Sequence, residues 1–326
     1  MIYVYLKNNI MSRETISIII PVFNEQEIIE KSITKVVKLT ESISIRLDTE
    51  IIIVNDGSND NTLKILEGSK HKIKIISFTR NFGHQMAITA GIDLCKGDFV
   101  ALLDADLQDP PKYIEAMLDI CLQNDCEIVY GVRNERPGES FFKKITASIF
   151  YKILNLMSET EIHKNSGDFA VFTRKAANEL IKLREKNRFV RGLIPWLGFK
   201  AIPFYYNRER RVEGKTKFTF FKMLKFSLDA IFSLSNKPLT FAIQLGAFNI
   251  VLGIIFSIYF LYNRIFSESP VPGFTAIIIS IILYSGIQIF LIGIVGSYIA
   301  RIFEETKNRP LYVIDKIIEL EKNDKT

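Results

Sequence analysis

The chain has few of the residues that build metal clusters and disulfide frameworks. Its 326 residues include only three cysteines and three histidines. Cys95, Cys121 and Cys126 are odd in number and lack the spacing of zinc ligands, which argues against a zinc site. Free cysteines are typical of a reducing cytosol. The first 20 residues also lack the apolar core and small-residue cleavage site of a signal peptide.

Charge is almost missing from residues 238–300, although the whole chain has a net charge of +6. Basic residues concentrate instead at 184–225 and 301–309. Basic segments beside apolar ones favour anionic lipid headgroups or a phosphorylated ligand as partners. Nucleic acid is the weaker alternative, because no RNA- or DNA-binding motif accompanies the basic run.

Two apolar runs, about 238–262 and 274–300, are each longer than the roughly 20 residues that span a bilayer. Two buried core helices are the alternative, which the length, the missing charge and the glycines of the second run disfavour. Basic residues flank the pair on its outer sides. The pattern therefore predicts a multi-pass transmembrane hairpin in the inner membrane, with both ends in the cytoplasm. Gly286 and Gly293 would permit helix packing in a homo-oligomer.

The segment 216–237 precedes the first apolar run and combines phenylalanines with lysines, mainly within Phe218–Leu234. This combination predicts an amphipathic helix lying at the membrane interface. An ordinary packed helix is the alternative.

The first half of the chain alternates short β-branched runs with helical patterns. Strands are expected at 16–22, 50–54, 72–78, 97–103 and 127–130, and helices at 26–42, 62–67, 83–94 and 111–123. The composition, with 48% hydrophobic residues, allows a substantial core. Such alternation predicts an α/β fold: a mainly parallel sheet with helices on both faces.

Asp104 and Asp106 follow the apolar run Phe99–Leu103 and are separated by one residue. Alternation along an extended chain places both carboxylates on the same side. Two hard oxygen ligands suit Mg²⁺ or Mn²⁺, and such an ion usually serves a bound phosphate. A solvated turn is the alternative, but the preceding strand and the closing Asp109-Pro110-Pro111 favour a site.

Polar residues follow the other expected strands too: Asn24-Glu25, Asp56 and Arg80-Asn81. All would fall on the carboxyl edge of one parallel sheet, where open α/β sheets bind ligands. Asp56 is able to accept hydrogen bonds from a base or a ribose. Alone, Asp56-Gly57-Ser58 is equally typical of a turn.

These motifs together resemble, in order and spacing, the GT-A glycosyltransferases of family 2. The resemblance is carried by 21–25, 54–58, 80–83 and 104–110. The chain is most similar to the polyisoprenyl-phosphate glycosyltransferases, the dolichol-phosphate mannose synthase and bactoprenol glucosyltransferase group, with further matches at 131–133, 166–169, 191–192, 208–217 and 298–310.

The resemblance implies a Rossmann-like GT-A catalytic domain at 1–215, facing the cytoplasm. The interfacial segment 216–237, the membrane hairpin 238–300 and a cytoplasmic tail at 301–326 would follow it.

The resemblance also implies roles for individual residues. The nucleotide sugar would be bound by Pro21, Asn24, Glu25, Asp56, Asp104 and Asp106. The metal, Mg²⁺ or Mn²⁺, would be held by Asp104, Asp106 and Gln108. The lipid phosphate would be bound by Arg208, Arg211, Lys215 and Lys217, although the two lysines are also typical of a solvated basic face. The catalytic residues would be Asp106, Asp168 and Arg133.

A polyprenyl phosphate acceptor is already anionic at neutral pH, so it needs less help from a base than a hydroxyl does. Asp168 would be either a base or an orienting group. The resemblance implies direct displacement with inversion at the anomeric carbon. No Gln-x-x-Arg precedes Trp196, so the motif of processive polysaccharide synthases is missing and transfer of a single sugar is favoured.

The expected function is therefore the transfer of one hexose to undecaprenyl phosphate, in a reaction that serves the cell envelope. UDP-glucose is the expected donor. The alternatives are N-acetylglucosamine, mannose or amino-arabinose as the sugar, a lipid or glycan hydroxyl as the acceptor, and a membrane-anchored nucleotide-sugar-binding scaffold.

Overall fold

A computed structural model describes residues 13–43, 46–134, 166–207, 237–266 and 273–321. The chain divides into two compact units. An α/β unit contains the described residues up to 207 together with the C-terminal residues from 310 onward, and a helical unit contains the long helices α9 and α10.

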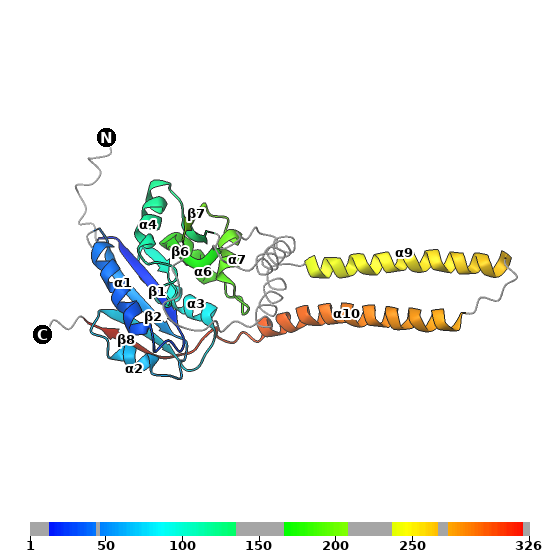
Figure 1. The fold of residues 1–326 in the computed structure, drawn as a ribbon, viewed down its shortest axis with the longest axis horizontal. Coiled ribbons are helices and arrows are strands. Elements are labelled where there is room, and N and C mark those ends of the chain that lie inside the picture. The colour runs from blue at the N-terminus through cyan, green and yellow to red at the C-terminus, as the bar shows by residue number, and fades with distance from the viewer. Residues whose placement is uncertain (1–12, 44–45, 135–165, 208–236, 267–272, 322–326) are drawn as a thin grey trace. The chain divides into compact units, whose positions relative to one another are not determined.

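The α/β unit is built on an eight-stranded sheet (Figure 1). Its strand order is β7-β5-β6-β4-β1-β2-β3-β8. Pairings are parallel between β1 and β2, β1 and β4, β2 and β3, and β5 and β7, and antiparallel for the other three. The strands are β1 Thr15–Val22, β2 Asp48–Asn55, β3 Ile73–Phe78, β4 Phe99–Leu102, β5 Ile128–Arg133, β6 Ser166–Thr173, β7 Ala201–Tyr206 and β8 Ile314–Leu320.

Helices cover both faces of the sheet. The helices α1 Ile29–Ile43, α2 Thr62–Glu67 and α4 Tyr113–Gln123 share one apolar cluster with the strands. The helices α3 His84–Leu94, α6 Arg174–Lys182 and α7 Val190–Trp196 share the other. Successive strand residues point to opposite faces, so Ile18 and Ile20 belong to the first cluster and Ile19 to the second. The predicted α/β architecture, mainly parallel with helices on both faces, is confirmed.

The strand β8 was not predicted, because residues 301–326 were expected to form only a tail. It runs antiparallel to β3 and closes one edge of the sheet. The residues before it are anchored at Tyr312, whose ring stacks on Phe78 with centroids 5.1 Å apart. The Tyr312 hydroxyl also donates a 2.7 Å hydrogen bond to Asp93 at the end of α3. The C-terminal segment is therefore an integral part of the sheet of the α/β unit.

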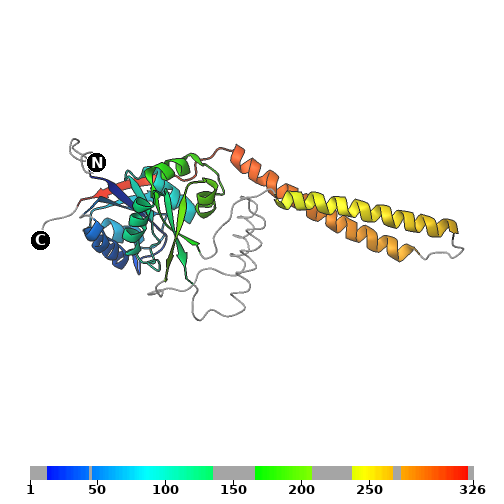
Figure 2. The same ribbon diagram turned by 90° about the horizontal axis from the view of Figure 1, so that it is seen from above.

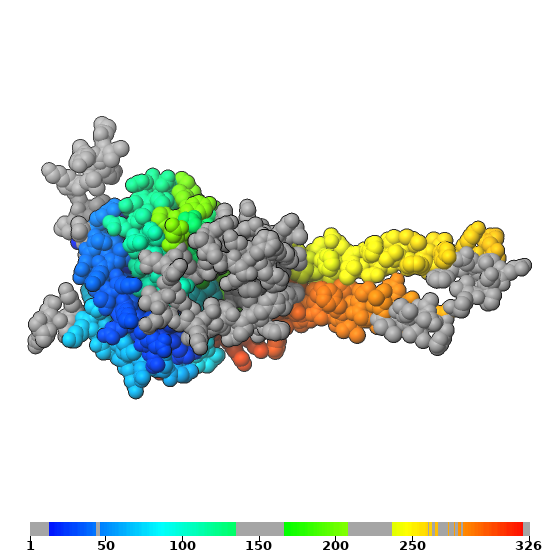
Figure 3. All heavy atoms as spheres, viewed as in Figure 1, coloured from blue at the N-terminus to red at the C-terminus, as the bar shows by residue number. Residues whose placement is uncertain are grey.

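The helical unit consists of α9 Lys237–Phe266 and α10 Phe274–Thr306. Figure 2 shows the two helices side by side, as does Figure 1. The stretches Lys237–Tyr259 and Leu283–Thr306 are long and apolar enough to cross a membrane, and 6% of each tested window is buried. Large apolar side chains such as Ile243, Phe248 and Ile289 are exposed, and much of α9 and the middle of α10 can be seen at the surface in Figure 3. Both predicted apolar runs are helical, whereas the predicted interfacial segment lies almost entirely outside the described residues.

Candidate active site

The carboxyl ends of β4, β1, β2 and β3 meet at one edge of the sheet, because these four neighbouring strands are parallel. Beyond β1, which contains the buried Pro21, the loops are braced against one another. Asn24 Oδ1 accepts a 2.8 Å hydrogen bond from the backbone amide of Asn59, and the backbone amide of Asn24 donates to Ser58 Oγ at 3.0 Å. The Glu25 amide donates to Thr62 Oγ1 at 2.9 Å. The residues predicted to bind a nucleotide thus stand on a fixed loop pair.

Asp56 lies at the end of β2 and is 2% exposed. Its carboxylate accepts hydrogen bonds from the backbone amides of Phe82 at 2.7 Å and Gly83 at 3.0 Å. Burial raises the pKa of Asp56, and the two amides oppose that shift. Gly57 has a φ of 62°, and a Cβ there would lie 2.2 Å from the backbone carbon of Arg80. Asp56 therefore fixes the loop that leads into α3, while a contact of Asp56 with a nucleotide stays a prediction.

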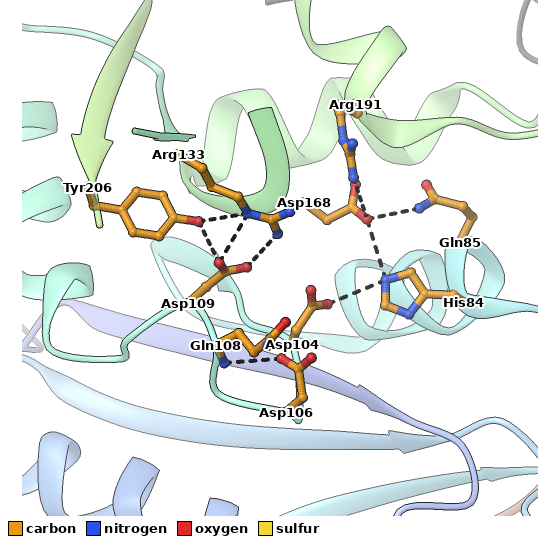
Figure 4. Close-up of polar contacts among 10 residues, drawn as sticks. All are labelled: His84, Gln85, Asp104, Asp106, Gln108, Asp109, Arg133, Asp168, Arg191 and Tyr206. Atoms are coloured by element: carbon orange, nitrogen blue, oxygen red, sulfur yellow. Dashed lines mark hydrogen bonds and ion pairs between the residues drawn. The ribbon is translucent and has the colours of Figure 1, made fainter. Parts of the chain in front are cut away.

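Asp104 and Asp106 lie in the turn that follows β4 (Figure 4). The Gln108 backbone amide donates to Asp106 Oδ1 at 3.1 Å and so orients that carboxylate. Leu107, which stands between Asp106 and Gln108, is buried and has a φ of 49°. This left-handed conformation costs about 1–2 kcal/mol for a residue with a Cβ. The turn holds its two carboxylates in place despite this strain, which is typical of functional sites.

The donor set fits a hard divalent cation. Burial raises the pKa of Asp104, and the neighbouring carboxylates of Asp168, Asp109 and Asp106 add to the shift while His84 opposes it. A cation would relieve that crowding of negative charge. No group of three or more potential metal-ligating side chains occurs within the described residues. Mg²⁺ commonly takes one or two carboxylates and completes its shell with phosphate oxygens and water, so two carboxylates suffice.

His84 opens α3 and lies between two carboxylates of the site (Figure 4). Its Nε2 is 3.4 Å from Asp168 Oδ2 and 3.6 Å from Asp104 Oδ1. These carboxylates outweigh the effect of burial and raise the pKa of His84 to about 9. At neutral pH His84 is therefore a cation that connects the loop after β4 to β6.

Asp168 lies near the start of β6, with its side chain 10% exposed, and is surrounded by donors. Gln85 Nε2 donates to its Oδ2 at 3.3 Å, and Arg191 contacts both of its oxygens at 3.3–3.4 Å. Despite its burial, Arg191 and His84 hold the pKa of Asp168 well below its usual range. The carboxylate is consequently ionised and a weak base.

Arg133, at the end of β5, is held by a buried carboxylate. Its Nη2 lies 2.9 Å from Asp109 Oδ2 and its Nε 3.3 Å from Asp109 Oδ1. The Tyr206 hydroxyl donates to the same carboxylate at 2.6 Å. A Cβ at Gly167 would lie 2.8 Å from Arg133 Nη2, so a side chain at residue 167 would displace the guanidinium from its present position. Asp109 keeps the pKa of Arg133 raised and the group charged.

The structure brings the predicted Asp104 and Asp168 together around His84, and the predicted Asp106 and Gln108 lie in the same turn as Asp104. It places Pro21, Asn24, Glu25 and Asp56 along the same sheet edge and Arg133 beside the turn that follows β4. The predicted lipid-phosphate residues Arg208, Arg211, Lys215 and Lys217 lie outside the described residues. Sequence reasoning gave no role to His84, Gln85, Asp109, Arg191 and Tyr206. The position of His84 and Gln85 directly after the Arg80–Gly83 motif was the available signal.

The arrangement suits chemistry on phosphorylated ligands. Paired carboxylates can hold a divalent cation, and His84, Arg133 and Arg191 add positive charge within the same region. Guanidinium groups match phosphate oxygens in geometry and charge.

Comparison with known proteins agrees with this chemistry. Residues 17–181 match the family model described as glycosyl transferase family 2. The chain is 41% identical over 303 residues to the uncharacterized glycosyltransferase YkcC of Bacillus subtilis (strain 168), covering 92% of this chain and 93% of the relative. It is 34% identical over 304 residues to the SfII prophage-derived bactoprenol glucosyl transferase of Shigella flexneri, covering 92% of this chain and 97% of the relative.

Among solved structures, the Mycobacterium tuberculosis glucosyl-3-phosphoglycerate synthase in complex with Mn²⁺, UDP and glucosyl-3-phosphoglycerate is similar with a TM-score of 0.45. The identity is 18%, with 68% of this chain and 78% of that chain covered.

Proposed function

Because the chain belongs to glycosyl transferase family 2, we propose that it transfers a single hexose from a nucleotide sugar to undecaprenyl phosphate. The donor that we propose is UDP-glucose. The observation that carries the proposal is the contact of His84 with both Asp104 and Asp168. It places a carboxylate suited to a metal ion beside positively charged side chains at one edge of the sheet. The similarity to bactoprenol glucosyl transferases extends over 92% of the chain and supports a polyprenyl acceptor.

On the donor side, the nucleotide would lie along the loops after β1 and β2, near Asn24, Glu25 and Asp56. Asp104 and Asp106 would hold Mg²⁺ or Mn²⁺, which when bound neutralises charge on the leaving diphosphate. The Gln108 amide keeps Asp106 oriented for that role. Arg133, fixed by Asp109, would supply a second positive charge to a phosphate group.

On the acceptor side, an oxygen of the lipid phosphate would attack the anomeric carbon while the bond to the nucleoside diphosphate breaks, which inverts that carbon. The attacking oxygen is already anionic, so no proton has to be removed from it. Asp168 then orients His84 and Arg191 instead of acting as a base, in keeping with its depressed pKa. These two cations would stabilise the phosphate as it approaches.

In this proposal α9 and α10 anchor the enzyme as a hairpin in the inner membrane, with the catalytic unit in the cytoplasm. Their length and apolar composition support membrane insertion. The basic residues that flank the pair on its outer sides support the orientation. The predicted lipid-phosphate residues between 208 and 217 would then precede the first span and lie near the emerging lipid headgroup.

The test is a donor screen with purified full-length protein, undecaprenyl phosphate and Mg²⁺ or Mn²⁺. UDP-glucose, UDP-N-acetylglucosamine, GDP-mannose and a UDP-amino-arabinose are offered separately, and undecaprenol serves as the matched acceptor without phosphate. The proposal requires a sugar-lipid product with the phosphate and none with the alcohol. Product from the alcohol alone would establish transfer to a hydroxyl instead.

A further inference from the structure

Gln85 makes two side-chain hydrogen bonds that join separate elements of the site. Its Nε2 donates to Asp168 Oδ2 of β6 at 3.3 Å, and its Oε1 accepts from the Val190 amide at 2.9 Å (Figure 4 shows the first). Val190 is the first residue of α7, and Arg191 follows it. One side chain on α3 thus connects β6 to the start of α7.

The two partners of Gln85 demand opposite chemistry. An ionised carboxylate only accepts hydrogen bonds, whereas a backbone amide only donates them. A primary amide is the side-chain group that satisfies both at once, with its NH₂ toward Asp168 and its oxygen toward Val190. A glutamate of the same shape keeps the bond to Val190 but places a second negative charge against Asp168.

The helix end that carries Gln85 is itself fixed. The carboxylate of Asp56 accepts from the backbone amides of Phe82 and Gly83, directly before α3 begins. Gly83 has a φ of 107°, a backbone conformation that residues with a side chain rarely adopt. The loop after β3 therefore fixes the position of Gln85, and the two hydrogen bonds of Gln85 in turn fix the positions of Asp168 and Val190.

We propose that Gln85 is a positioning residue for glycosyl transfer, which holds Asp168 and Arg191 in register so that their side chains pair beside the acceptor phosphate. This inference rests on the proposed function. Arg191 contacts both oxygens of Asp168, and its backbone neighbour is held by Gln85, so loss of the amide affects both ends of that ion pair. In this proposal Gln85 acts through these two residues and not by contact with a substrate.

The decisive variant is Gln85→Glu, measured in the full-length protein with undecaprenyl phosphate and the best donor of the screen. At pH 8 we expect kcat/KM for the acceptor to fall about 10- to 100-fold, because a small displacement of catalytic groups has effects of that size. The affinity for UDP, measured by calorimetry, stays as in the wild type. Gln123→Glu, the same change at an exposed position on α4, is the control and keeps wild-type activity.

The pH profile separates positioning from a merely structural role. Residue 85 contacts the carboxylate of Asp168, which His84 and Arg191 also contact, and His84 in turn contacts Asp104. Since residue 85 contacts Asp168 directly, we expect the negative charge of Asp168 to raise the pKa of a glutamate there, and once protonated this glutamate donates and accepts as the amide does. The ratio of Gln85→Glu to wild-type activity therefore rises as the pH falls from 8 to 6. Gln85→Met, which has similar length and no polar group, shows the loss without this recovery.

Wild-type activity of Gln85→Glu at pH 8 would overturn the role of Gln85, as would a loss that is the same at pH 6. If Gln85→Glu does not fold, wild-type kcat/KM in Gln85→Met would overturn it. A wild-type protein that forms no product with any donor would instead overturn the proposed function on which the inference rests.

Discussion

The guanidinium of Arg133 and the carboxylate of Asp109 form a two-point ion pair, with Nη2 to Oδ2 at 2.9 Å and Nε to Oδ1 at 3.3 Å. Asp109 is fully buried, whereas the Arg133 side chain is 20% exposed. The pair therefore has one end fixed in the core and one end open toward the site. The sequence alone indicates Asp109 only as part of the turn that closes the Asp104–Asp106 motif, whereas in the structure its carboxylate also binds Arg133.

Replacing Asp109 with Asn removes the buried charge and leaves the Arg133 cation without its partner. Breaking a buried pair in this way costs about 3–5 kcal/mol. Asp119→Asn is the control, since Asp119 forms a 2.8 Å pair with Arg46 on the surface. An exposed pair of this kind is worth about 1 kcal/mol or less. Thermal unfolding of the two variants in detergent should show a much larger drop for Asp109→Asn, and equal drops would contradict the account.

Gly57 is expected to tolerate no side chain. A Cβ at this position lies 2.2 Å from backbone atoms of Arg80, and the φ of 62° adds strain. We expect Gly57→Ala to destabilise the protein by more than about 1 kcal/mol. At Gly68 the nearest atom to an added Cβ is 3.5 Å away, so Gly68→Ala serves as the matched control. Similar unfolding midpoints for the two alanine variants would contradict this prediction, because they would show that the loop after β2 moves to make room for the added methyl group.

The metal-free protein should lose the stabilisation due to His84 as the pH rises. The neighbouring carboxylates raise its pKa from 6.5 to about 9. The stabilisation is complete below pH 6.5 and is lost as the pH passes 9. The unfolding midpoint of the wild type should therefore exceed that of His84→Gln at pH 6 and approach it by pH 9.5.

His84→Lys is the control, because an ordinary lysine stays charged through most of this range. Its lead over His84→Gln should change little between pH 6 and 9. A wild-type lead that grows with pH would contradict a charged His84.

Activity should depend on a divalent cation held by Asp104 and Asp106. Chelation with EDTA is expected to abolish turnover, and added Mn²⁺ or Mg²⁺ to restore it. Asp106→Asn keeps the shape but removes the charge, and we expect kcat to fall at least about 100-fold, the size seen when one electrostatic stabiliser is removed. Restoration by metal should fail in this variant while its unfolding midpoint stays close to the wild type. Full activity of Asp106→Asn would reject the metal role.

Much of the sheet could be predicted because its central strands are short apolar runs that end in polar residues. The strands 16–22, 50–54 and 72–78 were found within two residues of their bounds. β8 was missed because its sequence, Ile-Asp-Lys-Ile-Ile-Glu-Leu, does not alternate regularly between apolar and charged residues, and its partner β3 lies more than 230 residues earlier. Because the two strands are so far apart in the sequence, no local sequence pattern predicts that they pair.

The site was predictable where a motif follows a strand and not where the fold brings distant residues together. Asp104 and Asp106 follow directly from the strand before them. His84 and Gln85 were missed because two of the residues that they contact, Asp168 of β6 and Val190 of α7, come about 80 to 105 residues later in the chain. The hydrogen bond from Tyr206 to Asp109 likewise connects the edge strand β7 to the turn after β4.

The most direct test of the proposed reaction is the bonding of phosphorus in the lipid product. Full-length protein is incubated with undecaprenyl phosphate, a divalent cation and the best donor, and the purified lipid is analysed by ³¹P NMR. We predict that the phosphomonoester signal converts to that of a phosphodiester, and that mild acid releases the sugar. A sugar-bearing lipid whose phosphomonoester signal is unchanged, or no product with any donor, would contradict transfer to the lipid phosphate.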